Sequence, residues 1–216
     1  MIDAVVFDLD GILVDSEGIW AVVRRDYTHE RGGRWYEDAA GEMMGMSSVE
    51  WSRYMHDALS VDEPPERISE QVAQRVAESY GERLPLIPGA RDAVARLNAR
   101  WPLALASSAN QELIDLVLER AGLSKAFGAT VSSEEVPRGK PAPDVYLEAA
   151  RRISARPDRC AAIEDSGNGI LSAASAGMRV IVIPNRAFPP KGEALGASDR
   201  VLSSLEELTV DAIEDV

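Results

Sequence analysis

Short apolar runs alternate with helix-like segments along the chain after Gly89, and this alternation constrains the fold more than any other feature. The runs have the length of strands and lie at residues 102–106, 129–132, 160–163 and 180–183, and a similar run occupies residues 4–7. Because most of them lack a polar face, both faces are expected to be buried. The pattern therefore predicts a parallel sheet covered by helices on both sides.

The segments between these runs have helical periodicity and typical helix ends. They lie at residues 90–100, 111–121, 143–152 and 169–176, and a short last helix is expected behind a capping pattern at 203–206. Asn168 is expected to cap the helix that begins near Gly169.

The stretch from Asp15 to about Arg83 contains helical patterns and no convincing strand. Helices are expected up to residue 31, within 35–45, at 49–59 behind a capping box of Ser47 and Glu50, and from 65 to 80. The expected fold class is α/β, with a Rossmann-like parallel sheet core and an inserted all-helical cap domain. We assign residues 1–14 and 86–216 to the core and 15–85 to the cap, joined by linkers at 14–17 and 83–89 that act as a hinge.

The net charge of the protein limits the classes of ligand that it can bind. The 36 acidic residues outnumber the 23 basic ones, for a net charge of -13, and this excess argues against binding to nucleic acid or to anionic membranes. An anionic substrate would therefore need a metal ion or locally placed Lys and Arg side chains. A monomer is the default expectation.

Several features favour a cytoplasmic location. The single cysteine, Cys160, cannot form an intrachain disulfide, and its place at an apolar strand suggests a packed thiol. No apolar run approaches the length that spans a membrane, and the N-terminus lacks the pattern of a signal peptide.

Polar side chains collect where the predicted strands end. Asp8 and Asp10 follow the first strand, Ser107 and Ser108 the second, and Glu164 and Asp165 the run at 160–163, while Lys140 lies in a loop. Because ligands of open parallel sheets bind beyond the carboxyl ends of the strands, these residues are expected to meet at one rim. Asp8 and Asp10 are two positions apart in an extended segment, so both can face one pocket. Paired carboxylates are the kind of ligand that a hard cation such as Mg²⁺ prefers. Together with the serine hydroxyls and Lys140 they favour phosphoryl transfer, in which the phosphate oxygens need positive charge and hydrogen-bond donors.

The same segments carry a family resemblance. They are Asp8-Leu9-Asp10-Gly11, Ser107 after an apolar strand, Gly139-Lys140-Pro141 and Glu164-Asp165-Ser166, and their order and spacing resemble the haloacid dehalogenase-like superfamily. Over essentially its whole length the chain is similar to the branch of β-phosphoglucomutase and the sugar-phosphate phosphatases, which carries a helical cap between the first two motifs.

The resemblance implies a role for each matching residue. Asp8 resembles the nucleophile that forms an aspartyl-phosphate, and Asp10 resembles the general acid and base. The implied Mg²⁺ ligands are Asp8, Asp10 through its backbone carbonyl, Glu164 and Asp165, with Asp165 preferred over Glu164. Ser107, the backbone N–H of Ser108, and Lys140 would bind the transferring phosphate.

Three departures from the mutase pattern bear on the activity. Ser48 and Asn110 stand where mutases have an arginine and a lysine for a second phosphate, and Trp20 stands where they have a histidine. Without those cations a second phosphate would lack a counter-charge. We therefore expect a Mg²⁺-dependent phosphatase acting on a small phosphorylated metabolite such as a sugar phosphate. A β-phosphoglucomutase-like phosphomutase is the alternative, and a non-catalytic phosphosugar-binding protein is less favoured because Asp8 and Asp10 are both present.

Overall fold

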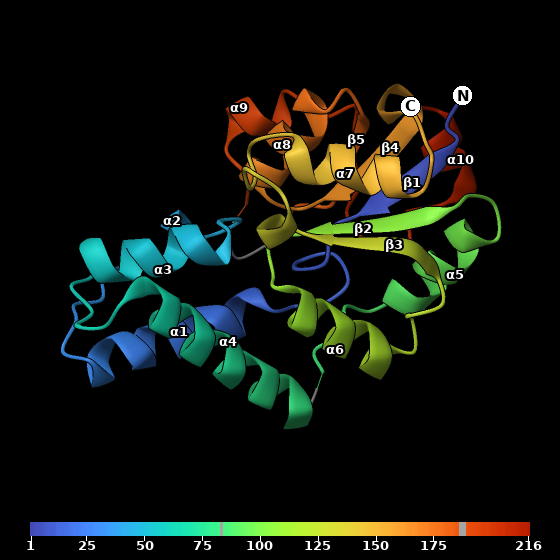
Figure 1. Ribbon diagram of the computed structural model, residues 1–216. Helices are drawn as coiled ribbons and strands as arrows, with labels where there is room; N and C mark the ends of the chain where they lie inside the picture. The colour runs from blue at the N-terminus through green and yellow to red at the C-terminus, as the bar shows by residue number, and fades with distance from the viewer. Residues whose placement is uncertain (83, 186–188) are drawn as a thin grey trace.

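The computed structural model describes residues 1–82, 84–185 and 189–216, and its centre is a six-stranded sheet (Figure 1). The strand order is β3-β2-β1-β4-β5-β6, and every pairing is parallel. The strands are β1 (Ala4–Phe7), β2 (Leu103–Ser107), β3 (Phe127–Ser132), β4 (Cys160–Glu164), β5 (Arg179–Val182) and β6 (Arg200–Val201). The predicted parallel sheet is confirmed, while the short edge strand β6 lies outside the prediction.

The order of the strands reverses between β1 and β4, so the carboxyl ends of these central strands form the switch point of the sheet. Asp8 extends the pairing past the end of β1, because its N–H donates to the carbonyl of Ile163 over 3.0 Å. The acidic residues that follow β1 and β4 are thereby brought side by side, at the place where ligands bind in sheets of this type.

Helices cover both faces of the sheet, as predicted. They are α5 (Ala90–Asn98), α6 (Gln111–Ala121), α7 (Asp144–Arg152), α8 (Gly167–Ser175), α9 (Gly192–Leu195) and α10 (Val210–Glu214), with short 3₁₀ turns η1 (Ser133–Glu135) and η2 (Pro157–Arg159). Val5 and Phe7 pack in one apolar cluster with α5 and α6, whereas Ala4 and Val6 pack in a second cluster with α7 and α8. Among the described helices, none has the length and apolar character needed to cross a membrane.

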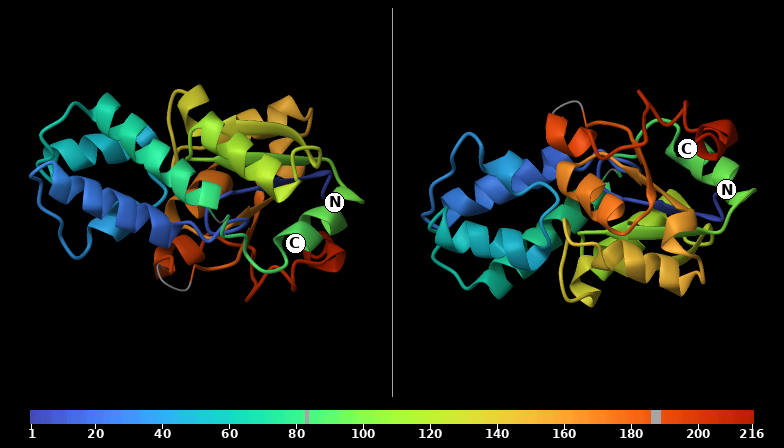
Figure 2. Two further views of the ribbon diagram at one scale, coloured as in Figure 1. Left: turned by 90° about the horizontal axis from the view of Figure 1, so that it is seen from below. Right: turned by 90° about the horizontal axis from the view of Figure 1, so that it is seen from above.

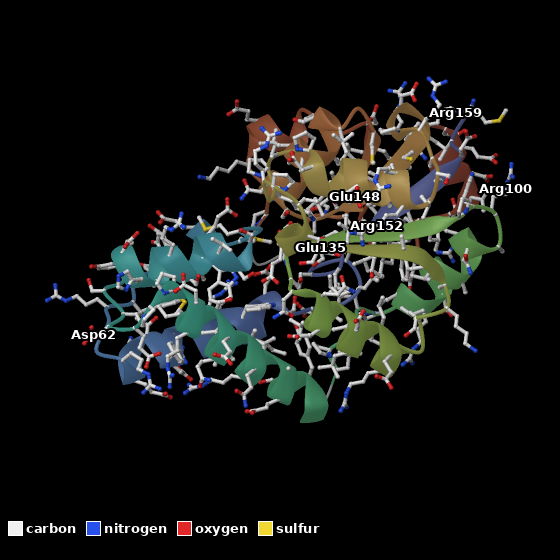
Figure 3. The ribbon with its side chains drawn as sticks, viewed as in Figure 1. Asp62, Arg100, Glu135, Glu148, Arg152 and Arg159 are labelled. Atoms are coloured by element: carbon white, nitrogen blue, oxygen red, sulfur yellow. The ribbon has the colours of Figure 1, made fainter. Side chains whose placement is uncertain are left out.

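Arg152 ties α7 to η1 on the surface of the core. Its guanidinium lies 2.8 Å from Glu148 and 3.1 Å from Glu135, and the three side chains lie together in Figure 3. Partly exposed ion pairs contribute less than about 1 kcal/mol each. The network therefore joins α7 to η1, which precedes the loop with Lys140, and adds little to the stability of the fold.

The helices α1 (Glu17–Glu30), α2 (Ala39–Glu42), α3 (Ser48–Asp57) and α4 (Pro65–Glu82) lie between β1 and α5 in the sequence. Figures 1 and 2 show them packed together at one end of the molecule, beside the sheet. The described part of this stretch contains no strand, in line with the helical prediction. The predicted capping box is also present, because the N–H and the hydroxyl of Ser47 both donate to Glu50 Oε2, at 2.8 and 2.7 Å.

The two segments that connect these helices to the sheet pair with each other. The pairing consists of an antiparallel bridge between Val14 and Leu86 and two flanking backbone hydrogen bonds, Asp15 to Pro85 and Ile87 to Leu13. Arg83, which belongs to the second predicted linker, lies outside the described residues. The predicted hinge therefore coincides with a short, hydrogen-bonded pair of extended segments.

The prediction for the last helix is wrong. The capping pattern at 203–206 starts no helix, and α10 begins instead at Val210, with Thr209 as its N-cap. The guanidinium of Arg96 binds the carbonyl of Leu205 at 3.0 Å. The same carbonyl also accepts the N–H of Leu208 at 3.3 Å, so residues 204–208 form isolated turns that do not continue into a helix.

The prediction that Asn168 caps α8 is also wrong. The helix begins earlier, at Gly167, and Ser166 caps it by accepting the N–H of Gly169 at 3.1 Å. Ser166 has the extended backbone that an N-cap requires, whereas Asn168 already lies in the first turn. The side chain of Asn168 instead donates to the carbonyl of Met44, between α2 and α3, over 3.2 Å. Asn168 thus links the sheet domain to the helical insertion.

Candidate active site

A tight turn after β1 brings Asp8 and Asp10 to one pocket, as their spacing predicts. Gly11 supplies the left-handed conformation of this turn, with a φ of 80°. A Cβ atom at Gly11 would lie 1.9 Å from Asp165 Oδ2, so any side chain there would collide with the acidic residue after β4. Glycine therefore allows the turn to pass close to Asp165.

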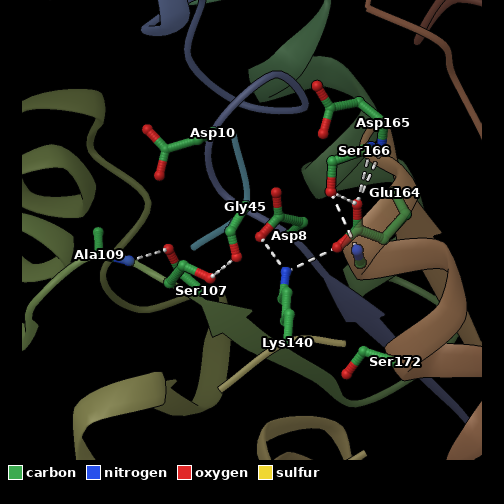
Figure 4. Close-up of polar contacts among 12 residues, drawn as sticks. Asp8, Asp10, Gly45, Ser107, Ala109, Lys140, Glu164, Asp165, Ser166 and Ser172 are labelled. Carbon is green, nitrogen blue, oxygen red and sulfur yellow. Dashed lines mark hydrogen bonds and ion pairs between the residues drawn. The ribbon is translucent and has the colours of Figure 1, made fainter. Parts of the chain in front are cut away.

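Asp8, Lys140 and Glu164 form a buried chain of charged groups (Figure 4). Lys140 Nζ donates to Asp8 Oδ1 at 2.7 Å and to Glu164 Oε1 at 2.6 Å. Burial acts to lower the pKa of Lys140, but the two carboxylates outweigh it and raise this pKa above its ordinary value. Lys140 therefore remains a cation and places its charge against Asp8.

Both carboxylate oxygens of Glu164 are occupied by protein donors. Oε1 accepts from Lys140 and from the Tyr146 hydroxyl at 2.7 Å, and Oε2 accepts the N–H groups of Asp165 and Ser166 at 3.0 and 3.1 Å. Burial alone would raise the pKa of Glu164, but Lys140 and these hydrogen bonds outweigh burial and lower it. Glu164 is therefore ionised and held in one orientation.

Asp165 presents an unsatisfied acceptor. Its Oδ2 atom is buried and has no hydrogen-bond partner among the described residues. One carboxylate oxygen from each of Asp8, Glu164 and Asp165 lies within 4.8 Å of the other two. Burial raises the pKa of Asp165, and the charges of Glu164 and Asp8 raise it further. Burial and mutual repulsion thus oppose the ionisation of all three carboxyl groups together, and a divalent cation between them would stabilise the ionised forms.

Asp10 is oriented from the start of α1. Its Oδ1 atom accepts hydrogen bonds from Ser16 Oγ at 2.5 Å and from Trp20 Nε1 at 3.4 Å. Burial raises the pKa of Asp10, and these two hydrogen bonds oppose the increase. Trp20 thus orients the second carboxyl group of the pocket.

The serine pair after β2 divides between two environments. Ser107 is fully buried, and its hydroxyl accepts the N–H of Ala109 at 3.0 Å. Ser108 donates to the carbonyl of Gly45, in the helical insertion, over 3.0 Å. The described residues that line the pocket include Ser108 and Ala109 but not Ser107. The structure therefore brings Asp8, Asp10, Asp165, Lys140 and Ser108 to one pocket, whereas Ser107 and Glu164 lie outside its described lining.

The helical insertion supplies much of the pocket, which has a free volume of about 40 Å³ and so holds only a few water molecules. The residues that it contributes include Glu17, Trp20, Arg24, Met43, Met44, Gly45, Met46, Ser48 and Trp51. Ser48 and Asn110, the neutral residues that disfavour a mutase, both line the pocket and are already engaged. Ser48 donates to Glu134, and the Asn110 side chain caps α6.

Sequence reasoning missed Arg24, the second cation among the described residues of the pocket. A signal was present, because Glu17, Trp20 and Arg24 recur at spacings of three and four residues and so share one face of a helix. The face that turns Trp20 toward Asp10 therefore also carries Arg24.

Comparison with known proteins agrees with the motifs. The model of the haloacid dehalogenase-like hydrolase family matches residues 2–177. Hexitol phosphatase B of Escherichia coli (strain K12) is 35% identical over 216 residues, which cover 95% of this chain and 94% of that protein. The phosphorylated carbohydrates phosphatase of Thermotoga maritima is 32% identical over 180 residues, 83% of each chain.

Solved structures share the whole architecture. A variant of CbbY from Rhodobacter sphaeroides, in complex with xylulose-(1,5)bisphosphate, has a TM-score of 0.84 at 26% identity, and the match covers 99% of both chains. The family model thus covers residues 2–177, and hexitol phosphatase B and the CbbY variant match almost the full length. The chain belongs to the haloacid dehalogenase-like hydrolase family, among its phosphoric monoester hydrolases.

Proposed function

We propose that the protein is a Mg²⁺-dependent phosphatase that hydrolyses a small phosphorylated metabolite such as a sugar phosphate. The observation that carries the proposal is the Asp8 carboxylate, which lies 2.7 Å from Lys140 at a pocket that Asp10 also lines. A nucleophile, a cation for the phosphate oxygens and a second acid are the groups that a two-step phosphoryl transfer requires. Residues 1–14 and 86–216 would form the catalytic core, and residues 15–85 its cap.

Asp8, Asp165 and the backbone carbonyl of Asp10 are the proposed Mg²⁺ ligands. The buried, unpartnered Oδ2 atom of Asp165 supports a cation here, because an unpaired carboxylate oxygen is costly inside a protein. Glu164 also belongs to the acidic cluster, but protein donors occupy both of its oxygens, so we assign it to positioning Lys140. When bound, Mg²⁺ would screen the charge of Asp8 from that of the substrate phosphate.

In the proposed reaction, Asp8 attacks the phosphorus atom, the bond to the leaving oxygen breaks, and Asp10 gives that oxygen a proton. Water then attacks the phosphorus atom of the aspartyl-phosphate and gives its proton to Asp10. The bond between phosphorus and Asp8 breaks, and inorganic phosphate is released. Lys140 and the backbone N–H of Ser108 would hold the phosphate oxygens during both steps, and we assign Ser107, which lies outside the described lining, to positioning the turn at Ala109.

The relatives favour a phosphorylated carbohydrate as the substrate. Hexitol phosphatase B and the phosphorylated carbohydrates phosphatase are named for such compounds, and CbbY binds xylulose-(1,5)bisphosphate. A free volume of about 40 Å³ is too small for a sugar phosphate, so the cap would have to open for the substrate to enter.

A phosphomutase is the alternative, and Arg24 is the observation that keeps it open. Neutral Ser48 and Asn110 argue against a second phosphate site, yet the described lining of the pocket holds Arg24 as well as Lys140. A mutase would convert one sugar phosphate into another through a bisphosphate, whereas a phosphatase releases inorganic phosphate.

A turnover assay separates these functions. The purified protein is incubated with Mg²⁺ and a panel of phosphosugars and other phosphorylated metabolites, and free phosphate and isomerised product are recorded together. We expect phosphate release that is abolished by Asp8→Asn and by EDTA and is restored by added Mg²⁺. Isomerisation that requires a bisphosphate primer and releases no phosphate would establish the mutase instead, and binding without either product would establish a binding protein.

A further inference from the structure

Arg24 is a buried cation that the proposed hydrolysis does not use. It lies in the middle of α1, lines the same pocket as Asp8 and Asp10, and is 6% exposed. Trp20, four residues earlier on the same helix face, donates to Asp10. The helix therefore places the Arg24 guanidinium in the pocket on the cap side of the reacting groups.

Two tryptophans hold this guanidinium in place. Its central carbon lies 4.5 Å from the ring centroid of Trp20 and 4.7 Å from that of Trp51. The two rings contact each other edge to face, with their centroids 5.8 Å apart. Stacking on aromatic faces restrains a guanidinium without using its N–H donors. Arg24 is thus oriented in advance of binding.

The N–H donors of Arg24 lack partners. Its Nε atom is buried and unpaired, and its side chain makes no hydrogen bond or ion pair with any residue that the structure describes. Burial lowers the pKa of Arg24 to about 10, against the opposing charges of Glu17 and Asp10. The side chain is therefore a cation at neutral pH. Glu17 and Asp10 stabilise this charge without hydrogen-bonding to it, so an anion in the pocket is the ligand that would use the free N–H donors of Arg24 best.

We propose that Arg24 binds a second anionic group of the substrate, a carboxylate or a phosphate, on the part that leaves when the phosphate ester is cleaved. The proposal rests on the phosphatase function above and specifies its substrate class, a phosphate ester whose leaving group is itself anionic. A guanidinium binds either anion through two parallel hydrogen bonds. Sugar hydroxyl groups can also accept from Arg24, but a neutral partner makes weaker hydrogen bonds to a guanidinium than an anion does.

Matched substrates isolate the charge of the leaving group. Glucitol 6-phosphate and 6-phosphogluconate differ only at C1, which is a hydroxymethyl group in the first and a carboxylate in the second. Glycerol 3-phosphate and 3-phosphoglycerate form the same pair on a shorter chain. Fructose 6-phosphate and fructose 1,6-bisphosphate form a third pair, which shows whether the second anion is a phosphate rather than a carboxylate.

Three variants are compared on each pair. Arg24→Gln removes the charge, Arg24→Lys keeps the charge without the planar fork, and Arg75→Gln is the matched control. Arg75 is also an arginine of the helical insertion that lies over an aromatic ring, 5.0 Å from the centroid of Tyr27. In contrast to Arg24, it is paired with Glu30 at 2.7 Å and lies outside the described lining of the pocket.

We expect the wild-type protein to prefer the anionic member of at least one pair by about tenfold or more in kcat/KM. In Arg24→Gln, kcat/KM should fall about ten- to a hundredfold for that anionic substrate and less than about threefold for its neutral counterpart. Arg24→Lys should fall between the two, and Arg75→Gln should match the wild type. Equal losses on both members of every pair would show a purely structural role for Arg24 and overturn the proposal.

A binding experiment keeps this test independent of turnover. Calorimetric titration of Asp8→Asn, with and without Arg24→Gln, gives the Kd for 6-phosphogluconate and for glucitol 6-phosphate. If the wild type turns over no substrate but Asp8→Asn still prefers the anionic ligand through Arg24, the phosphatase function fails and the anion site stands. If Asp8-dependent turnover is present but neither kcat/KM nor Kd depends on the charge of the leaving group, the anion site fails and the phosphatase stands.

Discussion

Glu17 lies in the first turn of α1 and lines the same pocket as Arg24. Burial, helped by the charge of Asp10, raises its pKa from 4.5 to about 7. Because this folded-state pKa lies above the unfolded value, the folded protein binds the proton more tightly, and stability falls as the pH rises from 4.5 to about 7. The ionised Glu17 therefore opposes folding at neutral and alkaline pH.

Glu17→Gln should remove this cost. The shift in pKa limits the destabilisation by ionised Glu17 to about 3 kcal/mol, and the partial exposure of the side chain reduces that value. We therefore expect the free energy of unfolding of Glu17→Gln at pH 8 to exceed that of the wild type by about 1–3 kcal/mol. At pH 4 the difference should vanish. Urea unfolding of both proteins at the two pH values measures it, and a gain that does not depend on pH would contradict the assignment.

Glu30→Gln is the control for this experiment. A hydrogen bond from Arg75 lowers the pKa of Glu30, so its ionised form stabilises the folded state above the unfolded pKa and this contribution is lost as the pH falls. Replacing this exposed residue should therefore bring no gain in stability at pH 8.

Gly169 gives a second prediction, because it lies against the carboxylate of Glu164. A Cβ atom at Gly169 would lie 1.7 Å from Glu164 Oε1, so Gly169→Ala must displace the side chain that binds Lys140 at 2.6 Å. We expect a loss of about 3 kcal/mol in the free energy of unfolding, together with most of the turnover.

Gly18→Ala is the matched control for this substitution. Gly18 is also a helical glycine, but a Cβ atom there would meet nothing within 4 Å. Gly18→Ala should raise the free energy of unfolding by about 0.5–1 kcal/mol, because alanine is the better helix former. Thermal unfolding measures both variants, and equal effects of the two substitutions would contradict the close approach at Gly169.

Residues that follow strands could be predicted from the sequence, whereas a pocket residue on a helix could not. Asp8 and Asp165 were identified because apolar runs mark the strands and the topology gathers their carboxyl ends, and Lys140 was identified through the loop motif Gly139-Lys140-Pro141. Arg24 shares the periodicity of Trp20, but arginine on a helix is usually exposed. Only the packing of Trp20 against Trp51 shows that Arg24 is enclosed.

At the scale of elements, the paired linkers give the proposed hinge a definite place. Val14 and Leu86 face each other in an antiparallel bridge, and backbone hydrogen bonds flank them on both sides. Residues opposite each other in such a pair have Cα atoms about 4.5–5.5 Å apart, which is within the range of a disulfide. A covalent link between the two linkers is therefore feasible.

A disulfide in the double variant Val14→Cys, Leu86→Cys should stiffen the hinge. We expect the oxidised variant to lose about tenfold or more in turnover, because the cap opens less freely, while its melting temperature stays the same or rises. Reduction of the same sample should restore turnover. Cys160 should not compete, because it is buried and burial raises its pKa to about 11. Unchanged turnover in the oxidised variant, or equal losses of turnover and stability, would contradict the hinge.

Strands with strong local signals were predictable, and elements fixed by distant contacts were not. β1 is apolar throughout, β2 and β4 are apolar up to a last polar residue, and the positions of all three follow directly from the sequence. β6 is only two residues long and pairs at the edge of the sheet, so it has no periodicity to detect. The false helix start at 203–206 has a good capping pattern, but it forms only isolated turns, and Arg96 from a distant helix shares the carbonyl of Leu205 with one of them.

At the scale of the whole molecule, an acidic protein receives an anionic substrate through local positive charge. The net charge of -13 repels a phosphate ester at long range, whereas Lys140 and Arg24 offer cations inside the pocket. The excess of acidic residues indicated that such a cation is needed, and the loop motif around Lys140 identified one. The second cation depends on how the helical insertion sits on the sheet, which contacts such as Asn168 with Met44 determine.

The central claim is that Asp8 forms a covalent phosphoenzyme, and trapping that species tests it most directly. Protein that is turning over a phosphate ester with Mg²⁺ is quenched in acid and reduced with borohydride, which converts the acyl phosphate of an aspartate into homoserine. Peptide mass spectrometry then locates the modified residue. We predict homoserine at position 8 alone, and none in the Asp8→Asn variant or in EDTA. Homoserine at another aspartate, or its absence while phosphate is released, would contradict the role of Asp8 as the nucleophile.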